Sequence, residues 1–246
     1  MAQPSRLHSK INCGDNIMKV NHQVPQYVAE FIGTFFLVFF GCGSMILGEV
    51  YPHYNSGFIP VIWGGSVAMM IYAVGHISGA HFNPAVTLAF WSVKRFPGKR
   101  VPGYLISQIL GGLLASLVHL VIFGAGHKFG ATEISLSLSG GIIVEVILSF
   151  ALMFVIISVA TDSRAVGEMA GIAIGTTVAL CAFVGGPLTN ASMNPARSIA
   201  PAIMSGNYTN LWVFIMAPLL GAVLGAKIYE WIRCHKDNDS DTHGCC

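Results

Sequence analysis

The sequence predicts an all-α membrane protein with six transmembrane helices, two re-entrant half-helices and an inverted repeat. Three observations support this fold class. The 246-residue chain is 54% hydrophobic and only 10% charged, against roughly 25% charged residues in an ordinary soluble domain. Its six long apolar stretches each approach the length that a bilayer-spanning helix needs, roughly 20 residues. The tripeptide Asn-Pro-Ala occurs twice, at 83–85 and 194–196, in similar surroundings in each half of the chain.

The six predicted spans lie in one membrane domain between two polar tails. The expected spans are residues 27–48, 57–76, 103–124, 139–161, 166–185 and 211–232. Three spans per half is an odd number, so the second half must enter the bilayer from the opposite face, as in an inverted repeat. The predicted organisation is a tail at 1–24, a membrane domain at 25–233 with a first repeat at 25–124 and a second at 139–233, and a tail at 234–246.

The basic residues predict which ends of the spans face the cytoplasm, because cytoplasmic loops carry the excess of Lys and Arg. They gather before the first span, between spans two and three, between spans four and five, and at the end of span six. These residues are Arg6, Lys10, Lys19, Lys94, Arg95, Lys99, Arg100, Arg164, Lys227, Arg233 and Lys236. With six spans these segments share one side, so both termini are predicted to be cytoplasmic. We expect a multi-pass protein of the plasma membrane.

Each Asn-Pro-Ala box predicts the start of a short helix, because Asn is a good helix cap and Pro is tolerated in the first helical turn. The surrounding segments, 77–92 and 186–204, are moderately apolar and too short to cross a bilayer. Irregular backbone enters a membrane only where it is buried in protein or lines water. We therefore expect two re-entrant loops whose carbonyls line a pore, each followed by a half-helix. The alternative is a pair of surface turns capped by asparagine.

A glutamate within a predicted span precedes each box at a similar distance: Glu30 lies 53 residues before Asn83, and Glu145 lies 49 residues before Asn194. A charged side chain inside a span is a candidate functional group. We favour a structural role, in which each carboxylate accepts hydrogen bonds from N–H groups of the adjacent loop that would otherwise have no partner. A proton relay is the alternative, but no further carboxylates connect to either glutamate.

Composition excludes several other classes of protein. A formal net charge of +2 is too small to indicate a nucleic-acid partner. The six cysteines show no spacing typical of a metal site, and no set of catalytic side chains falls on one aqueous face, so we expect no enzyme, no metal and no cofactor. Lipid attachment at the terminal Cys245 and Cys246, and glycosylation of Asn207 in the sequence Asn-Tyr-Thr, are left open.

The runs "HFNPAVT" and "NPARS", the paired glutamates and the six spans resemble the aquaporin, or major intrinsic protein, family over roughly residues 25–233. The resemblance implies an aquaporin-like fold with a pore in each protomer of a homotetramer. It also implies a central constriction at the two boxes, an outer selectivity filter, and support of the pore loops by two glutamates and a histidine. The constriction residues are Asn83, Pro84, Ala85, Asn194, Pro195 and Ala196; the filter residues are Trp63, Ala182, Ala191 and Arg197; the supporting residues are Glu30, Glu145 and His81.

The filter residues are similar to those of plant nodulin-like intrinsic proteins and of aquaglyceroporins. Water-only channels of the family usually carry Phe and His at the first two filter positions, where this chain has Trp63 and Ala182. The resemblance therefore implies a passive channel for water and small uncharged solutes such as glycerol, which excludes protons and ions. Bacterial glycerol facilitators usually have Asp after the arginine, where this chain has Ser198, so the glycerol prediction depends on the expected pore width.

The sequence leaves three alternatives to this function. They are a strict water channel, an ion-conducting channel or proton-coupled transporter, and a structural member of the fold with a closed pore. For His81 a purely structural role is the alternative, and for Trp63 a role as an anchor at the membrane interface. Water, glycerol, the lipid bilayer and further copies of this chain are the expected partners.

Overall fold

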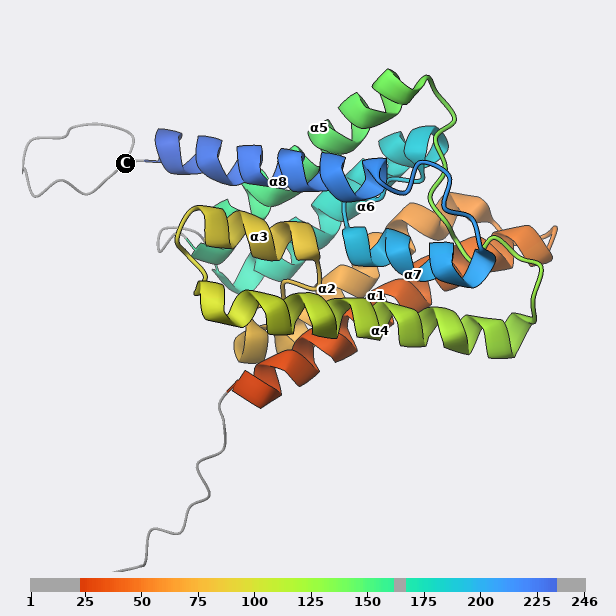
Figure 1. Ribbon diagram of the computed structural model, residues 1–246, viewed down its shortest axis with the longest axis horizontal. Coiled ribbons are helices and arrows are strands. Elements are labelled where there is room, and N and C mark those ends of the chain that lie inside the picture. The colour runs from red at the N-terminus through yellow and green to blue at the C-terminus, as the bar shows by residue number, and fades with distance from the viewer. Residues whose placement is uncertain (1–22, 162–166, 234–246) are drawn as a thin grey trace, which may run out of the picture.

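The computed structural model describes residues 23–161 and 167–233, and every regular element in these residues is a helix (Figure 1). The long helices are α1 (Gln23–Val50), α2 (Ile59–Ser78), α4 (Val101–Phe123), α5 (Leu138–Thr161), α6 (Ala170–Thr189) and α8 (Val213–Ile232). Two short helices, α3 (Pro84–Ser92) and α7 (Pro195–Ser205), begin at the Asn-Pro-Ala boxes. Residues 1–22 and 234–246, which make up the predicted polar tails apart from 23–24 and include Cys245 and Cys246, lie outside the described residues, as does the predicted cytoplasmic Arg164.

In the described residues six helices are long and apolar enough to cross a membrane, which confirms the six predicted spans. Their bounds differ from the predicted ones most in α1, which begins earlier, and in α6, which begins and ends later. Helix α6 continues through Gly186 and Pro187 to Thr189, although we expected the span to end at 185, because a proline in a helix removes one N–H donor without ending every helix that contains it. Within the two re-entrant segments, the non-helical backbone is limited to residues 79–83 and 190–194.

The packing of the helices follows the predicted repeat. Helix α1 packs on α2 and α4 in the first half, and α5 packs on α6 and α8 in the second. The half-helices are exchanged between the halves, because α3 packs on α8 and α7 packs on α4. Helices α2 and α6 then contact each other across the molecule. Each half therefore holds the re-entrant helix of the other, and the two loops before these helices meet inside the bundle.

Glycines allow the long helices to approach until backbones touch. A Cβ atom on Gly64 of α2 would overlap the carbonyl oxygen of Gly175 on α6, and one on Gly111 of α4 would overlap the carbonyl of Phe31 on α1. Such close approach is the main source of helix–helix packing in lipid, where no hydrophobic force draws apolar helices together. The α2–α6 contact matters most for function, because these two helices carry Trp63 and Ala182.

Replacing Gly64 with alanine is expected to destabilise the bundle by about 1–3 kcal/mol, the usual cost of overpacking. Gly65 is the matched control, since a Cβ there meets nothing within 4 Å. Both changes raise helix propensity equally, so only the contact with Gly175 distinguishes them. The measurement is the melting temperature of each variant in detergent. Equal melting temperatures for the two variants would contradict the close packing of α2 on α6.

One end of the bundle gathers basic residues. Arg100 Nη1 donates to Gln26 Oε1 at 3.2 Å, and Arg95 Nε lies 2.6 Å from Glu230 Oε1. These contacts tie the start of α1, the segment 93–100 and the end of α8 together at one end, on the left of Figure 1. The connector 124–137 between α4 and α5 lies at the opposite end.

Candidate functional site

Each half-helix is capped by the asparagine of its own box. Asn83 Oδ1 accepts a hydrogen bond from Ala85 N at 2.9 Å, and Asn194 Oδ1 accepts one from Ala196 N at 3.0 Å. Pro84 and Pro195 follow as the first helical residues, where a missing N–H has no consequence. Each asparagine is only 5% exposed, so the alternative of two surface turns is wrong.

The same two asparagines join the loops to each other. Asn83 Nδ2 donates to the carbonyl of Met193 at 2.8 Å, and Asn194 Nδ2 donates to the carbonyl of Phe82 at 2.9 Å. A side-chain amide has two N–H donors, so one on each asparagine remains after this exchange. Both side chains line one cavity inside the bundle. Two amide donors, from opposite halves of the chain, are therefore available at the same place.

Glu30 is fully buried behind the first loop and accepts four hydrogen bonds. Its Oε1 accepts from Ser78 Oγ at 2.7 Å and from His81 N at 2.9 Å. Its Oε2 accepts from Phe82 N at 2.6 Å and from Gln108 Nε2 at 2.8 Å. Two of these donors are backbone N–H groups of the loop, which has no regular structure to pair them. The carboxylate thus holds the loop on helices α1 and α4.

Glu145 occupies the corresponding position behind the second loop with one fewer partner. Its Oε1 accepts from Thr189 Oγ1 at 2.6 Å and from Ser192 N at 2.8 Å, and its Oε2 accepts from Met193 N at 3.0 Å. Thr189 takes the place that Ser78 has in the first half. In the described residues no amide side chain matches Gln108, so the two supports are similar but not equal.

His81 lines the cavity and also has structural contacts. Its Nδ1 lies 3.0 Å from Thr87 Oγ1 on α3, and its ring stacks on Phe90 at a centroid distance of 4.9 Å. Thr87 Oγ1 in turn accepts from Gln108 Nε2 at 3.0 Å, which connects the histidine to the support of Glu30. The ring therefore faces the cavity from a fixed position.

The four predicted filter residues line the same cavity as the two asparagines. The guanidinium carbon of Arg197 lies 4.7 Å from the centroid of the Trp63 ring, within the range of a cation–π contact. Trp63 is only 7% exposed, so the alternative of an anchor at the membrane interface is wrong. Ala182 and Ala191 complete the wall with methyl groups.

Arg197 is buried, and its partners in the described chain are uncharged. Nη1 donates to the carbonyl of Gly130 at 2.6 Å, and Nη2 donates to the carbonyl of Asn190 at 3.4 Å and lies 3.3 Å from Met45 Sδ. Its Nε has no hydrogen-bond partner among these residues. No carboxylate there forms an ion pair with the guanidinium, and only Glu145 interacts with its charge at longer range, so a positive charge remains at the cavity wall.

A wider vestibule of about 320 Å³ lies outside this wall, lined among others by Met45, Pro60, Phe183 and Asn190. The cavity that contains the asparagines holds about 50 Å³. The two spaces share only Trp63 and Ala182 among their lining residues. Trp63 and Ala182 therefore lie where the two spaces border each other.

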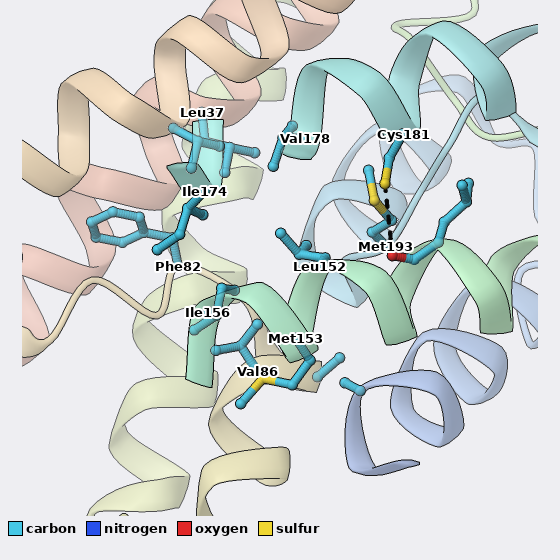
Figure 2. Close-up of a cluster of buried hydrophobic side chains, with 14 of the residues drawn as sticks. Leu37, Phe82, Val86, Leu152, Met153, Ile156, Ile174, Val178, Cys181 and Met193 are labelled. Carbon is cyan, nitrogen blue, oxygen red and sulfur yellow. Dashed lines mark hydrogen bonds between the residues drawn. The ribbon is translucent and has the colours of Figure 1, made fainter. Parts of the chain in front are cut away.

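Most of the inner cavity is apolar. Its wall takes side chains from α1, α2, α3, α5, α6 and α7 and from both loops. Figure 2 shows several of the apolar ones. The labelled residues of Figure 2 that line it are Leu37, Phe82, Val86, Leu152, Ile156, Ile174, Val178 and Met193. Polar groups are limited to the asparagines, His81, Ser192, Arg197 and loop backbone. A molecule in the inner cavity therefore meets hydrogen-bonding groups on part of the wall and hydrocarbon on the rest.

Sequence reasoning missed the contribution of the connector between the two halves. The two predicted repeats, 25–124 and 139–233, leave residues 125–138 without a predicted role, but Phe129, Gly130, Ala131 and Thr132 are buried, and the Gly130 carbonyl accepts a hydrogen bond from Arg197. Gly130 has a φ of +71° and packs on Cys42 of α1. The signal in the sequence was Phe129 before Gly130 in a connector rich in glycine and polar residues, which alone does not identify its partner.

Side chains of the connector 124–137 form contacts with carboxylates near the vestibule. Lys128 Nζ donates to Glu133 Oε2 at 2.9 Å, and His127 Nδ1 lies 3.5 Å from Glu49 Oε1. The hydrogen bond and charge of Glu133 raise the pKa of the exposed Lys128 above its ordinary value. These pairs leave Arg197 as the unpaired charge that faces the pore. In the described residues no group of three or more His, Cys, Asp or Glu side chains is placed to hold a metal.

Comparisons with known proteins agree with this geometry. The model of the Major intrinsic protein family matches residues 17–229. Nodulin-26 of Glycine max is 48% identical over 214 residues, which cover 85% of this chain and 78% of that protein. Aquaporin NIP1-1 of Zea mays is 46% identical over 217 residues, 85% of this chain and 75% of that protein.

A solved structure is also similar to this chain. The X-ray structure of the aquaglyceroporin from Plasmodium falciparum gives a TM-score of 0.75 at 26% sequence identity, covering 85% of this chain and 96% of that one. The fold predicted from the sequence is thereby confirmed. With a family match over most of its length and relatives of this identity, the chain belongs to the major intrinsic protein family, the family of the aquaporins.

Proposed function

We propose that this channel conducts water and small uncharged solutes such as glycerol, and that it excludes protons and other ions. The family is one of channels and not of enzymes, so the open question is what passes. The observation that carries the proposal is that Trp63 and Ala182 line both the vestibule and the inner cavity, beside the charged Arg197. The proposed passage runs between the indole ring and the Ala182 methyl group.

The two asparagines form the central constriction, which molecules pass in single file. Helices α3 and α7 direct their N-terminal ends to this point, and the partial positive charge of a helix N-terminus opposes cations, including hydronium. The remaining N–H of Asn83 and of Asn194 donates to the oxygen of a passing molecule. A water held by two donors directs its own hydrogens away along the file, which interrupts a continuous proton wire.

Arg197 acts as the second barrier to cations. Its charge has no carboxylate partner in the described residues, so it repels any cation that enters the passage. Its guanidinium borders the inner cavity and donates to an oxygen of a permeating solute, while the carbonyls of Gly130 and Asn190 keep the group in place. Uncharged solutes with oxygens replace part of their lost hydration at this point.

Glycerol suits a passage of this kind because it has a carbon backbone and several hydroxyl groups. The exposed part of the Trp63 ring and the methyl group of Ala182 pack on the carbons, and the donors and carbonyls of the opposite side bind the hydroxyls. Ala182 supports the proposal because a methyl group leaves room that a histidine ring would fill. The similarity to a structure titled as an aquaglyceroporin is in line with this reading.

We further propose a homotetramer with one pore in each protomer, oriented in the plasma membrane with both termini cytoplasmic. Large apolar side chains on the outer face of α4, such as Ile106, Leu110 and Leu117, are exposed in the single chain and would be covered by lipid or by a neighbouring copy. The basic end of the bundle supports the orientation. The paired helices support a first repeat at 25–124 and a second at 139–233.

Replacing Ala182 with histidine tests the proposed width of the passage. Glycerol flux is expected to fall by about tenfold or more, since one added group in a close-fitting site typically changes rates by 10-fold to 200-fold. Water flux is expected to fall much less. Both are measured by stopped-flow light scattering on proteoliposomes. Phe183→His is the control, because Phe183 borders the vestibule and not the inner cavity. An equal loss of both fluxes, or no loss of either, would argue against this assignment of the filter.

A further inference from the structure

Gly41 of α1 lies directly against the ring of Trp63. A Cβ atom added to Gly41 would overlap Cδ2, Cε3 and Cζ3, three atoms of the six-membered part of the indole. Gly41 is itself buried, and its carbonyl accepts a hydrogen bond from Ser44 Oγ at 2.7 Å. The missing side chain is therefore what lets the ring rest on the backbone of α1.

Helix α1 cannot easily retreat from this contact. It is packed on α4, where Cβ atoms at Gly111 would overlap the carbonyl of Phe31. The same stretch of α1 also supports Arg197 of the filter, because Met45 contacts its guanidinium and Cys42 packs on Gly130. A side chain at position 41 would thus have to displace the ring and not the helix.

The spaces that border the Trp63 ring on its other sides belong to the pore. The ring lines both the inner cavity and the vestibule, and Arg197 lies 4.7 Å from its centroid. Displacement away from α1 therefore moves the indole into the passage opposite Ala182. Close-packed interiors transmit a change of one methyl group to their neighbours.

We propose that Gly41 is a specificity-determining residue, which sets the width of the passage by allowing the Trp63 ring to lie back against α1. It is a positioning residue, since it acts on the solute only through Trp63. The inference rests on the proposed function, in which this passage admits glycerol as well as water. It adds a position outside the four filter residues to those that decide which solute passes.

A second glycine on the same helix provides a contrast. A Cβ on Gly33 would overlap the ring of Phe82. The backbone of Phe82 belongs to the central constriction, because its N–H donates to Glu30 and its carbonyl accepts from Asn194. Gly33→Ala is expected to reduce water and glycerol flux together, because it disturbs the point that every molecule passes. Gly41→Ala is expected to change the ratio of the two fluxes.

The test compares the glycerol-to-water flux ratio of the full chain with those of Gly41→Ala, Trp63→Ala, the double variant and Gly65→Ala in proteoliposomes. Gly41→Ala is expected to lower the ratio by about tenfold. Gly65→Ala, where the added methyl meets nothing within 4 Å, is expected to leave it unchanged. In the Trp63→Ala background the Gly41→Ala change is expected to have no effect, because every atom that the methyl overlaps has been removed.

The outcomes separate this inference from the function on which it rests. If the unaltered protein conducts glycerol but Gly41→Ala has the same glycerol-to-water flux ratio, the inference is wrong and the proposed function stands. Absence of glycerol flux in the unaltered protein overturns both. If Gly41→Ala fails to insert into liposomes but the double variant inserts and conducts, the overlap with the ring is established and the inference is supported. If the double variant also fails, Gly41 serves the fold independently of Trp63 and the inference is wrong.

Discussion

Replacing Glu30 with leucine is expected to prevent formation of a stable channel. Four donors lose their acceptor at once: the hydroxyl of Ser78, the N–H groups of His81 and Phe82, and the amide of Gln108. Each buried donor without a partner costs about 1–3 kcal/mol, so the total loss is about 4 kcal/mol or more, a large share of the stability of a typical protein. Melting temperature in detergent and the fraction of protein that reconstitutes with water flux are the two readouts.

Glu145 provides the matched comparison for this prediction. Its carboxylate accepts three hydrogen bonds in place of four, so Glu145→Leu is expected to destabilise the channel less than Glu30→Leu by about 1–3 kcal/mol. Glu30→Gln retains one acceptor oxygen and is expected to fall between the unaltered protein and the leucine variant. An unchanged melting temperature in Glu30→Leu would show that the first loop is held by other contacts.

Replacing Arg197 with valine is expected to admit cations to the pore. A unit charge about 5 Å from an ion contributes about 3 kcal/mol at an effective dielectric constant of 20, so its removal corresponds to about a hundredfold in cation flux. The leak remains partial because the ends of α3 and α7 still oppose cations at the asparagines. Ionic current under voltage clamp is the measurement, with osmotic water flux recorded on the same variant.

Arg197→Lys separates the effect of the positive charge from the effect of the guanidinium shape. Lysine keeps the positive charge but lacks the planar fork that binds Gly130 and Asn190 together. It is expected to exclude cations nearly as well as arginine while solute flux changes. A current in Arg197→Lys equal to that in Arg197→Val would mean that the position of the guanidinium, and not its charge, provides the barrier.

The sequence predicts the framework of this protein well because its signals are local or repeated. Apolar stretches of bilayer length reveal the six spans, and the Asn-Pro-Ala boxes mark the starts of α3 and α7 to the residue. The positions of Glu30 and Glu145 relative to the boxes indicate the repeat before any contact is known. Trp63 and Ala182 are different, since only the resemblance to a family identifies them, by alignment from the boxes.

What the sequence does not reveal are contacts between segments far apart in the chain. Gly41 looks like any small residue in an apolar helix, and its meeting with Trp63 depends on how α1 crosses α2. Gly130 holds Arg197 across 67 positions, and no local pattern encodes that pairing. The end of α6 at Thr189 was also misplaced, because Gly186 and Pro187 favour a break by local rules while the packed helix continues through them.

The most direct test of the proposed function is a single set of measurements on the unaltered protein in proteoliposomes. Osmotic water flux, glycerol flux and ionic current are recorded on the same preparation, with empty liposomes as the reference. We expect water and glycerol fluxes well above the reference and no current above it. Ionic current without osmotic water flow, or water flow without glycerol flux, would contradict the proposal.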